Sequence, residues 1–375
     1  MAVEVRPVEG RGELTSFIEF PFGLHGGTPW VPPIISERRQ FLDRTKNPYF
    51  DHADAEYLLA WRDGELVGRI TVQIDGRWDE HQGGKDAQFG FIEAEDDQEV
   101  FDALLGAAED WARDRRRERL LGPMDFTTND ECGLLIEGYD MHPLILQPWH
   151  PPYYRERIEA AGYGKTMDLL MWNLDMGGLK QGDRFAEAIH EVADKVESEH
   201  GITVRNMRMK DLEAEIGRFM EVYNSAWDRN WGFVPVTDEE VAFQAKNLKQ
   251  VLDPRWAFIA ERDGEVLGAA LTLPDINQVT KKMNGRLLPF GWLKFLRGKR
   301  KIDRVRVFAL GVKPEYQHTG IAARFYVRHI ETAAEVGVTG GETGWILEVN
   351  EPMNRAMEGM GGTVVKRYRL FEKAL

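Results

Sequence analysis

Two segments of the chain repeat one pattern of apolar runs interrupted by an Asp-Gly pair. Residues 60–75 read AWRDGELVGRITVQID, and residues 260–275 read AERDGEVLGAALTLPD. Because Asp-Gly suits the tight turn between antiparallel strands, each segment is predicted to form a β-hairpin. A second matching pair, residues 153–174 and 353–373, each predicts a short helix, a pair of glycines and a closing strand. Two matching pairs in the same order indicate two copies of one domain.

The boundary between the two copies is predicted within a Gly-rich polar segment, MGGLKQGD at residues 176–183. This segment follows the apolar strand LLMWNLD. It precedes a helix over about 184–200 and the strand ITVRNM, which open the second copy. The expected domains are therefore residues 1–178 and residues 179–375.

The stretch from residue 308 to residue 335 predicts a strand, a polar turn and a helix. Phe308–Val312 is short and apolar, Pro314 stops any helix from running through, and helical spacing of apolar residues resumes from Ile321. The first N–H groups of such a helix lack an intrahelical acceptor and carry the positive end of the helix dipole. A glycine at Gly320 and the alanines after it leave these groups uncovered, which favours a phosphate-binding turn. The alternative is a joint whose glycine only eases packing.

The corresponding place in the first copy carries acidic residues. Its strand, Phe89–Ile92, leads into Glu93, Glu95, Asp96 and Asp97 before the next helix. Carboxylates at a helix N-terminus suit the helix dipole, but they would repel a pyrophosphate. Only the second copy is therefore expected to bind a phosphate ligand. The first is expected to be a degenerate copy, kept for its shape or for gripping a second substrate.

The composition is that of a globular protein in a reducing compartment. The chain has 375 residues, with 43% hydrophobic and 29% charged residues and one cysteine, Cys132. The N-terminal residues lack the apolar core of a signal peptide, and no apolar run approaches the ~20 residues that span a bilayer, so a cytoplasmic location is expected. The net charge of −14 argues against a nucleic-acid partner, and the nine histidines show no spacing typical of metal ligands.

One segment departs from this acidic composition. Residues 281–301, KKMNGRLLPFGWLKFLRGKRK, contain eight basic residues, no acidic residue and many apolar and aromatic ones. Such a segment is typical of contact with an anionic membrane surface or of a lid over a lipid-like substrate. It is too long and too aromatic for a simple connection, so it is expected to fold as a lid over the phosphate-ligand site. The alternative is a loop whose aromatic side chains fill the core while its charges face water.

The phosphate-binding turn carries a resemblance to a known superfamily. Residues 317–322, QHTGIA, resemble the Q/R-x-x-G-x-G/A loop of the GNAT superfamily, the acyl-CoA-dependent N-acyltransferases. Longer segments resemble a bacterial group of tandem GNAT proteins related to the bacterial ceramide synthases. These segments are NPYFDH, GPMDFTTNDECGLL, YNSAWDRNWGFVP and NGRLLPFGWLKFL.

The resemblance implies an α/β (α+β) fold of two tandem GNAT-like domains, each with a mixed, mostly antiparallel twisted sheet flanked by helices. It also implies acyl-CoA as the donor substrate, with the turn amides on the pyrophosphate and the preceding strand along the pantetheine arm. No metal is implied. Transferred to this chain, the CoA-binding residues are Leu310, Val312, Gln317, His318, Thr319, Gly320, Ile321, Ala322, Ala323 and Asn354.

The next strand, predicted as Trp345–Asn350, carries the candidates for catalysis. Glu348 could take the proton of the amine directly or through water, or it could simply face solvent. Many members of the superfamily have a tyrosine that protonates the leaving thiolate, and Met357 or Ala356 stands at that position here. Tyr368 or Tyr326 could replace it, or the thiolate could leave without a protein donor. The predicted catalytic residues are Glu348, Asn350 and Tyr368.

The acceptor site is expected near residues 222–240, where aromatic side chains surround a few polar groups. The first copy adds a polar cluster, Asn129, Asp130 and Glu131, although packing alone could explain both stretches. The predicted acceptor-binding residues are Asn224, Trp227, Asp228, Trp231, Phe233 and Trp292.

The function favoured by these patterns is acyl-CoA-dependent transfer of an acyl group to an amine, with a long-chain or lipid-like amine preferred. Residues 281–301 would then contact the inner face of the membrane peripherally. The alternatives are an acetyltransferase for a small polar amine and a non-catalytic acyl-CoA-binding protein.

Overall fold

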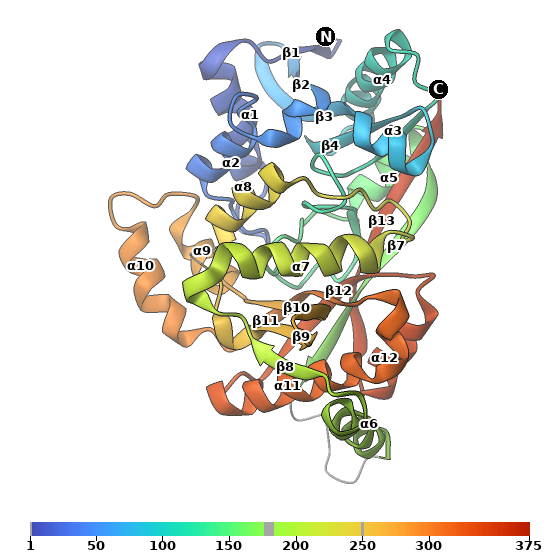
Figure 1. The fold of residues 1–375 in the computed structure, drawn as a ribbon. Helices are drawn as coiled ribbons and strands as arrows, with labels where there is room; N and C mark the ends of the chain where they lie inside the picture. Colours follow the sequence, from blue (N-terminus) through green and yellow to red (C-terminus); the bar gives the residue numbers. More distant parts are fainter. Residues whose placement is uncertain (1, 176–183, 249–250) are drawn as a thin grey trace.

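The computed structural model describes residues 2–175, 184–248 and 251–375, and in this part of the chain thirteen strands form one continuous sheet (Figure 1). The path of neighbouring strands is β1-β2-β3-β4-β5-β13-β7-β12-β11-β10-β9-β8, and β6 pairs with β13. Residues 2–175 are called the N-terminal half below, and residues 184–375 the C-terminal half.

The N-terminal half contributes seven of these strands and five α-helices. Its elements are β1 (Glu4–Pro7), α1 (Gly10–Leu24), α2 (Ile35–Phe41), η1 (Pro48–Asp51), β2 (Ala53–Arg62), β3 (Glu65–Asp75), α3 (Gly76–Gln82), β4 (Asp86–Ala94), α4 (Gln98–Asp114), β5 (Arg119–Gly122), β6 (Leu134–Glu137), α5 (Tyr153–Ala160) and β7 (Gly164–Asp175).

The described part of the C-terminal half contributes the other six strands. Its elements are α6 (Arg184–His200), β8 (Thr203–Asn206), η2 (Met209–Asp211), α7 (Leu212–Trp227), α8 (Asp238–Leu248), η3 (Pro254–Trp256), β9 (Ala257–Arg262), β10 (Glu265–Pro274), α9 (Asn277–Thr280), η4 (Lys281–Met283), α10 (Gly291–Gly298), η5 (Lys299–Lys301), β11 (Arg304–Val312), η6 (Pro314–Thr319), α11 (Ile321–Val336), β12 (Gly340–Leu347), α12 (Glu351–Gly359) and β13 (Thr363–Ala374).

Both predicted hairpins are confirmed, as β2–β3 and β9–β10. Asp63 and Gly64 have φ of 55° and 87°, and Asp263 and Gly264 have φ of 50° and 85°. Positive φ at both central residues is what the type I′ turn requires, so the Asp-Gly pairs work as predicted. The second matching pair is also present, since α5 leads into β7 as α12 leads into β13.

The two halves exchange their last strands. β13, from the end of the chain, lies between β5 and β7, while β7 lies between β13 and β12. The two long strands run side by side through the middle of the molecule (Figure 1). Each half therefore completes its sheet with a strand of the other. The division at residue 178 stays a prediction about the chain, while in space the sheet is continuous across it.

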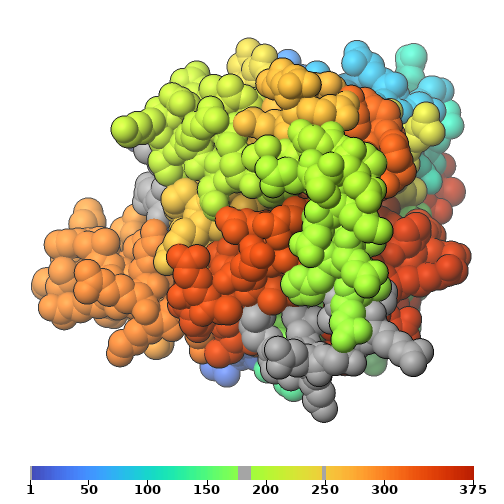
Figure 2. Space-filling model, turned by 60° about the horizontal axis from the view of Figure 1, so that its bottom comes forward, coloured from blue at the N-terminus to red at the C-terminus, as the bar shows by residue number. Residues whose placement is uncertain are grey.

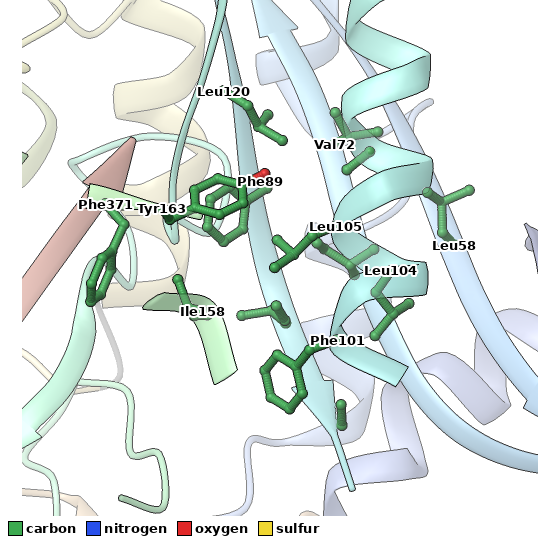
Figure 3. Packing of buried hydrophobic residues seen from close by; sticks show 14 of the residues in the cluster. Leu58, Val72, Phe89, Phe101, Leu104, Leu105, Leu120, Ile158, Tyr163 and Phe371 are labelled. Atoms are coloured by element: carbon green, nitrogen blue, oxygen red, sulfur yellow. The ribbon is translucent and has the colours of Figure 1, made fainter. Parts of the chain in front are cut away.

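The exchanged strands also fill the hydrophobic cores. Phe371 of β13 belongs to the core of the N-terminal half, together with Phe101 and Leu104 of α4 (Figure 3). In the reverse direction, Leu170 and Trp172 of β7 pack against residues of α12. Separating the halves would remove part of each core as well as a strand.

Helices cover both faces of the sheet in each half. A Cβ at Gly68 of β3 would meet Leu104 of α4 at 2.8 Å, and one at Gly268 of β10 would meet Ile321 of α11 at 2.9 Å. The residue after Gly68 points to the other face, where Arg69 donates to the Phe17 carbonyl of α1. In each half a glycine therefore lets one helix, α4 or α11, pack directly against the backbone of the sheet.

The predicted fold class is confirmed. In the described ranges most strand pairs are antiparallel, and only β4–β5 and β11–β12 pair in parallel, over residues 86–88 with 119–121 and residues 304–307 with 340–343. A bulge at Phe91 follows the parallel stretch of β4, and one at Phe308 follows that of β11. Beyond each bulge the two parallel strands separate, so each half contains a gap in the sheet.

Candidate functional site

The gap between β11 and β12 is the first feature of the candidate site. These strands pair only up to Val307, just before the bulge at Phe308. On the side that α11 and α12 cover, the gap leads into a mostly apolar cavity of about 80 Å³. The lining of this cavity includes Leu310, Tyr326, His329, Met357 and Met360.

The start of α11 has the form of an anion-binding turn. Gly320 has φ of +83°, and a Cβ there would lie 2.7 Å from Val192 of α6, so a larger residue does not fit. No side chain caps α11, and its first turn contains no acidic residue. The N–H groups of this turn therefore meet no competing carboxylate from their own helix.

The predicted CoA-binding residues of β11 and the turn lie together around the end of β11. Gln317 and His318 are exposed on the 3₁₀ turn, and the Thr319 hydroxyl donates to the Tyr316 carbonyl at 2.6 Å. Leu310 lines the cavity. Val312 and Ile321 are buried beneath the turn, while Ala322 and Ala323 are half-buried in the first turn of α11.

Tyr326 and His329, both on α11, line this cavity with defined protonation states. His329 has Nε2 2.7 Å from the Thr272 hydroxyl and Nδ1 2.7 Å from the Phe325 carbonyl. Burial lowers the pKa of His329 to about 4 and raises the pKa of Tyr326 to about 12. At neutral pH the gap therefore contains a neutral imidazole and a protonated phenol.

The strand boundary predicted around Glu348 is wrong. β12 runs from Gly340 to Leu347, so Glu348 follows the strand and Asn350 caps α12 by accepting a hydrogen bond from Met353 N at 3.3 Å. The glycines at the start of β12 weaken the strand pattern there, which shifted the prediction towards the C-terminus. Both candidate catalytic residues lie in the turn between β12 and α12.

Glu348 and Asn354 contact β7, the strand that the N-terminal half contributes. One oxygen of Glu348 lies 2.7 Å from Lys165 Nζ, and the other accepts from Asp168 N at 3.1 Å. Asn354 accepts from Trp172 Nε1 at 2.9 Å. The ion pair favours the structural interpretation of Glu348, which the sequence also allowed, and its catalytic role stays a prediction.

Tyr368 lies on β13 in a buried polar cluster apart from the turn of Glu348. Its hydroxyl is 3.5 Å from Gln147 Oε1, and burial raises its pKa well above the ordinary value. Beside it, Lys366 Nζ and Glu342 Oε1 form an ion pair at 2.6 Å with both side chains about 1% exposed. Arg306, also fully buried, donates to the Gly344 carbonyl. This cluster joins β13 to β12 and β11.

The predicted acceptor-binding residues of the stretch 222–240 lie mainly along the seam between the halves. Trp227 stacks on Tyr223 and covers Gly311 of β11, where a Cβ would lie 2.2 Å from the indole. The other predicted residues contact either the C-terminal half itself or side chains of the N-terminal half. Asn224 accepts from Val236 N, the Asp228 carbonyl lies 3.0 Å from His81 Nε2, Phe233 packs on His81, and Trp231 packs beside the core that contains Trp78.

Residues 281–301 form a short helical projection rather than a cover over the turn at Gly320. Lys281 Nζ donates to the carbonyls of Thr28 and Pro29, and Ile35 N donates to the Gly285 carbonyl, so the segment rests on the α1–α2 connection. Figure 2 shows it protruding from the molecular surface. Its outer side chains include exposed Leu288, Phe290, Trp292 and Leu296.

A larger cavity, of about 320 Å³, lies beneath this projection and reaches into the gap of the N-terminal half. None of the predicted acceptor-binding residues lines it. Its apolar lining comes from both halves and includes Trp30, Ile34, Ile145, Leu146, Met283, Leu287 and Phe295. Its polar lining includes Arg38, Arg69, Glu93, Asp125, Asp130, Glu131 and His150.

Three carboxylates of the β5–β6 connection stand at the polar end of this cavity. Arg38 donates to Glu131 at 2.7 Å and lies 3.6 Å from Asp125, whose other oxygen accepts from Phe91 N at 2.7 Å. Burial and the neighbouring charge of Glu131 raise the pKa of Asp125 to about 7, and burial raises the pKa of Asp130 to about 8. Carboxylates therefore outnumber the cations that face them here.

A second buried group surrounds Glu93 on β4. His25 Nε2 and the Tyr154 hydroxyl each lie 2.7 Å from the same oxygen of Glu93, and Arg69 lies 3.8 Å from the other. Burial opposes the charge on Glu93, but His25 and Arg69 hold its pKa at about 2. The expectation that Glu93 stands at a helix entrance is wrong, because β4 extends to Ala94 after its bulge and α4 begins at Gln98.

Sequence reasoning noted Asp130 and Glu131 as a polar cluster but missed the cavity that they line. Arg38, Arg69 and His150 come from three distant parts of the chain, and no spacing links them. The available signal was the density of charged residues within otherwise apolar segments such as GPMDFTTNDECGLL.

The described residues show neither a metal-ligand cluster nor a membrane-spanning helix. No group of His, Cys, Asp and Glu side chains among them is arranged to hold a metal ion. No helix in the described ranges has the length and apolar character needed to cross a bilayer.

Two bacterial proteins are similar to the chain along its whole length. It is 39% identical over 381 residues to the bacterial ceramide synthase of Caulobacter vibrioides, covering 100% of this chain and 98% of that protein. It is 37% identical over 379 residues to protein YghO of Escherichia coli, covering 99% and 95%. No family model matches the chain.

Solved structures share the fold at low sequence identity. A tandem GNAT protein from the clavulanic acid biosynthesis pathway superposes with a TM-score of 0.57 at 14% identity, over 99% of this chain and 98% of that one. A GCN5-related N-acetyltransferase from Sphaerobacter thermophilus gives a TM-score of 0.52 at 15% identity, over 99% and 95%. The tandem arrangement of two GNAT-like halves thus accounts for the entire chain.

Proposed function

Because the chain belongs to the family of tandem GNAT proteins that includes the bacterial ceramide synthase of Caulobacter vibrioides, we propose that it transfers an acyl group from acyl-CoA to an amine. The observation that carries this proposal is the uncapped N-terminus of α11 at the end of a strand that has separated from its parallel neighbour. The N-terminal half offers no equivalent turn, so one donor site per chain is proposed.

The C-terminal half fits the donor. The turn from Gln317 to Ala323 would hold the pyrophosphate, because it presents helix N–H groups without an acidic side chain in the first turn. Leu310 and Val312 would pair with the pantetheine arm, and Asn354 would contact it from α12. When bound, acyl-CoA supplies a thioester carbonyl that an amine can attack.

Transfer requires the amine nitrogen to lose a proton as it bonds to the acyl carbon, and the departing sulfur to gain one. Tyr326 lines the gap and is protonated, since burial raises its pKa to about 12, so it is proposed as the donor to sulfur. Asn350 and Tyr368 lie outside this cavity's lining and are proposed to act only through positioning. Glu348 is kept as the candidate acceptor of the amine proton.

A long-chain or lipid-like amine is proposed as the acceptor. The name of the Caulobacter relative points to a lipid product, and the large cavity of this chain is apolar at the end beneath residues 281–301. An acetyltransferase for a small polar amine has no comparable use for such a cavity. Pure acyl-CoA binding without transfer is the remaining alternative.

Peripheral contact with the inner face of a membrane through residues 281–301 is part of this proposal. Leu288 and Phe290 are 76% and 68% exposed, unusually high for large apolar side chains, and the segment around them carries eight basic residues. Basic residues near an anionic bilayer contribute about 1 kcal/mol each. The segment would bring the opening of the cavity to the surface where lipid amines reside.

The donor site is tested by thermal unfolding with CoA, acetyl-CoA and palmitoyl-CoA. A ligand at about a hundred times its Kd should raise the free energy of unfolding by roughly 2.7 kcal/mol. Transfer is then measured with palmitoyl-CoA against dodecylamine and against a small polar amine. Stabilisation without transfer to either amine would favour the binding protein, and transfer to the small amine alone would favour the acetyltransferase.

Membrane contact is tested by co-sedimentation with vesicles that contain phosphatidylglycerol. Replacing Phe290 and Trp292 with Ser should reduce the bound fraction severalfold, because both side chains are exposed on the projection. Val349→Ser is the matched control, since Val349 is 63% exposed but lies outside the basic segment. Equal binding of the parent to neutral and anionic vesicles would contradict the electrostatic part of the proposal.

A further inference from the structure

We propose that the 320 Å³ cavity between the halves is the binding site for the acceptor amine, with its ammonium group at Asp125, Asp130 and Glu131 and its apolar chain beneath residues 281–301. This inference rests on the proposed function and places the second substrate in the half that lacks a donor site. The N-terminal half is then a substrate-binding domain rather than a structural remnant.

The shape and chemistry of the cavity suit an amphiphilic ligand. One end is lined by Ile145, Leu287 and Phe295, which come from the β6–α5 connection and the projection. The other end carries Asp125 and Glu131, whose side chains are 15% and 27% exposed. An apolar wall with a few convergent charged groups is the usual form of a site for a ligand with one polar end.

The charges at the polar end favour a cation. Arg38 is shared between Glu131 and Asp125, and Asp130 bonds to the Thr127 hydroxyl at 2.9 Å without a cation of its own. Burial raises the pKa of Asp130 to about 8, so without a ligand it is protonated at neutral pH, and a bound ammonium group would favour its ionised form. An anionic ligand would meet the carboxyl groups of Asp125 and Glu131 and would gain no ion pair from them.

Arg69 adds a hydrogen-bond donor to the same cavity. It is 7% exposed, and its Nε has no hydrogen-bond acceptor among the described residues. Its other nitrogens are engaged by the Phe17 carbonyl and by Glu93. An oxygen on the ligand would satisfy this Nε, although the buried Nε atoms of Arg62 and Arg117, outside the cavity, also lack an acceptor, so the proposal rests on the carboxylates and the shape of the cavity.

The polar end also leads towards the donor half. A small cavity lined by Asp130, Asn129 and Gln244 adjoins the large one, sharing Asp130 with it. A third cavity shares Asn129 and Gln244 with the second and includes Phe308, the bulge residue of β11. Three separate cavities that share lining residues thus lie between the carboxylates and the bulge of β11.

The experiment measures binding of three probes to the full chain without a donor: dodecylamine, dodecanol and dodecanoate, each below its micellar concentration. Quenching of intrinsic tryptophan fluorescence reports occupancy, because Trp30 and Trp149 line the cavity. The amine is expected to bind at least tenfold more tightly than the alcohol, and dodecanoate more weakly than either.

Variants assign the selectivity to the carboxylates. Glu131→Gln and, separately, Asp130→Asn should weaken dodecylamine binding about tenfold and leave dodecanol unchanged, while Leu287→Ala should weaken both probes alike. Two carboxylate variants are used so that a folding defect in one, detected by its thermal midpoint, does not decide the result. Equal affinities of the parent for amine and alcohol would overturn the inference, as would equal losses of both probes in both carboxylate variants.

The two proposals fail in distinguishable ways. Stabilisation by palmitoyl-CoA depends on the C-terminal turn, so it should be the same in the parent and in Glu131→Gln. A protein that CoA stabilises but that shows no preference for the amine keeps its donor site and loses this acceptor site. A protein that selects the amine but ignores CoA keeps the acceptor site and loses the proposed function.

Discussion

The gap of the N-terminal half and the gap of the C-terminal half start from the same backbone geometry. Each follows a type I′ hairpin, a glycine under a helix, a short parallel pairing and a β-bulge, at Phe91 in one half and Phe308 in the other. They differ in what surrounds the gap. The C-terminal gap ends at an uncapped helix, whereas the N-terminal gap opens on the large cavity.

In the N-terminal half, the N-terminus of α4 is already capped by acidic side chains of the chain itself. Asp97 caps α4 by accepting from Glu99 N at 2.9 Å, and Arg62 lies 2.7 Å from Asp97. Arg157 pairs with Asp96 at 2.8 Å. These bonds occupy the N-terminus of α4. The corresponding N-terminus in the other half, that of α11, is the proposed phosphate site. The two halves thus share the gap and differ at the helix that follows it, which is why the phosphate site is proposed for the C-terminal half alone.

The largest expected effect comes from separating the halves. Residues 1–178 alone would lack β13 beside β5, and residues 179–375 alone would lack β7 beside β12, so each fragment would expose unpaired strand edges and an incomplete core. Each fragment expressed alone is expected to be insoluble or unfolded by circular dichroism. Co-expressed fragments are expected to form a soluble complex. A folded, monomeric fragment would show that the strand exchange is dispensable.

A smaller but still large effect is expected at the ion pair that anchors the exchanged strand. Lys366→Met leaves Glu342 as a buried, unpaired charge and should reduce the free energy of unfolding by about 3–5 kcal/mol. The double variant Lys366→Met with Glu342→Leu should recover part of the loss, because the unpaired carboxylate is gone, while the buried Arg306 loses a neighbouring negative charge. Urea denaturation measures the free energy of unfolding of the single and the double variant. A double variant as unstable as the single one would show that the loss comes from packing rather than from an unpaired charge.

Next in size is the effect of a negative charge on the donor turn. Ala323→Glu places a carboxylate in the first turn of α11, where it should favour the helix but repel the CoA pyrophosphate, weakening CoA binding about tenfold or more. Ala334→Glu is the matched control, exposed near the end of the same helix. The thermal midpoint of Ala323→Glu without ligand should not fall below that of the parent. Gly320→Glu is a poorer choice, since φ of +83° and the contact with Val192 would strain any larger residue.

The sequence carried the local elements of both halves but not their pairing. Asp-Gly turns and the helix after Gly320 follow from local conformational preferences, which single sequences encode well. The exchange of β7 and β13 could not be predicted, because either strand has the pattern to complete either half and the choice depends on the whole assembled sheet.

The candidate site likewise has one part that could be predicted from the sequence and one part that could not. The turn from Gln317 to Ala323 is contiguous, so its residues could be found from one motif. The polar end of the large cavity combines Arg38 with Asp125 and Glu131, which meet only after α2 packs against the β5–β6 connection. Acidic residues in the sequence pointed to repulsion of phosphate, while their burial in a cavity became visible only in the fold.

A pH-dependent effect is expected from Asp130. Burial raises its folded pKa to about 8, above the ordinary value of 3.8, so between these values the folded state holds a proton that the unfolded state has released. Stability should therefore fall as the pH rises from 4 to 8. Asp130→Asn removes this contribution, and its free energy of unfolding should gain up to about 4 kcal/mol on the parent between pH 5 and pH 8, at about 1.4 kcal/mol per pH unit. Parallel curves for the two proteins would contradict the assignment.

His52 also makes stability fall as the pH rises, and it is present in the parent and in Asp130→Asn. Its bonds to Asp75 and Glu240 overcome burial and raise its pKa to about 9. The resulting stabilisation is complete below pH 6.5 and is lost as the pH rises through 9. Because this contribution is common to the parent and Asp130→Asn, it cancels in their difference.

The smallest effect on stability is expected from Glu348, and its variants decide whether the exchanged strand β7 holds a catalytic group or only a structural one in the turn after β12. The Glu348 carboxylate is held by Lys165 Nζ and by Asp168 N, both on β7, so Glu348→Gln should lose one half-exposed ion pair and about 0.5–1 kcal/mol of stability. Lys165→Met should lose somewhat more, because Lys165 Nζ also lies 3.2 Å from Asp168. If Glu348 only ties β7 to the turn after β12, both variants should keep kcat within about twofold of the parent from pH 6 to pH 9. A positioned base typically contributes ~10²- to 10⁴-fold, so a loss of that size in Glu348→Gln, absent from Lys165→Met, would make Glu348 the group that accepts the amine proton.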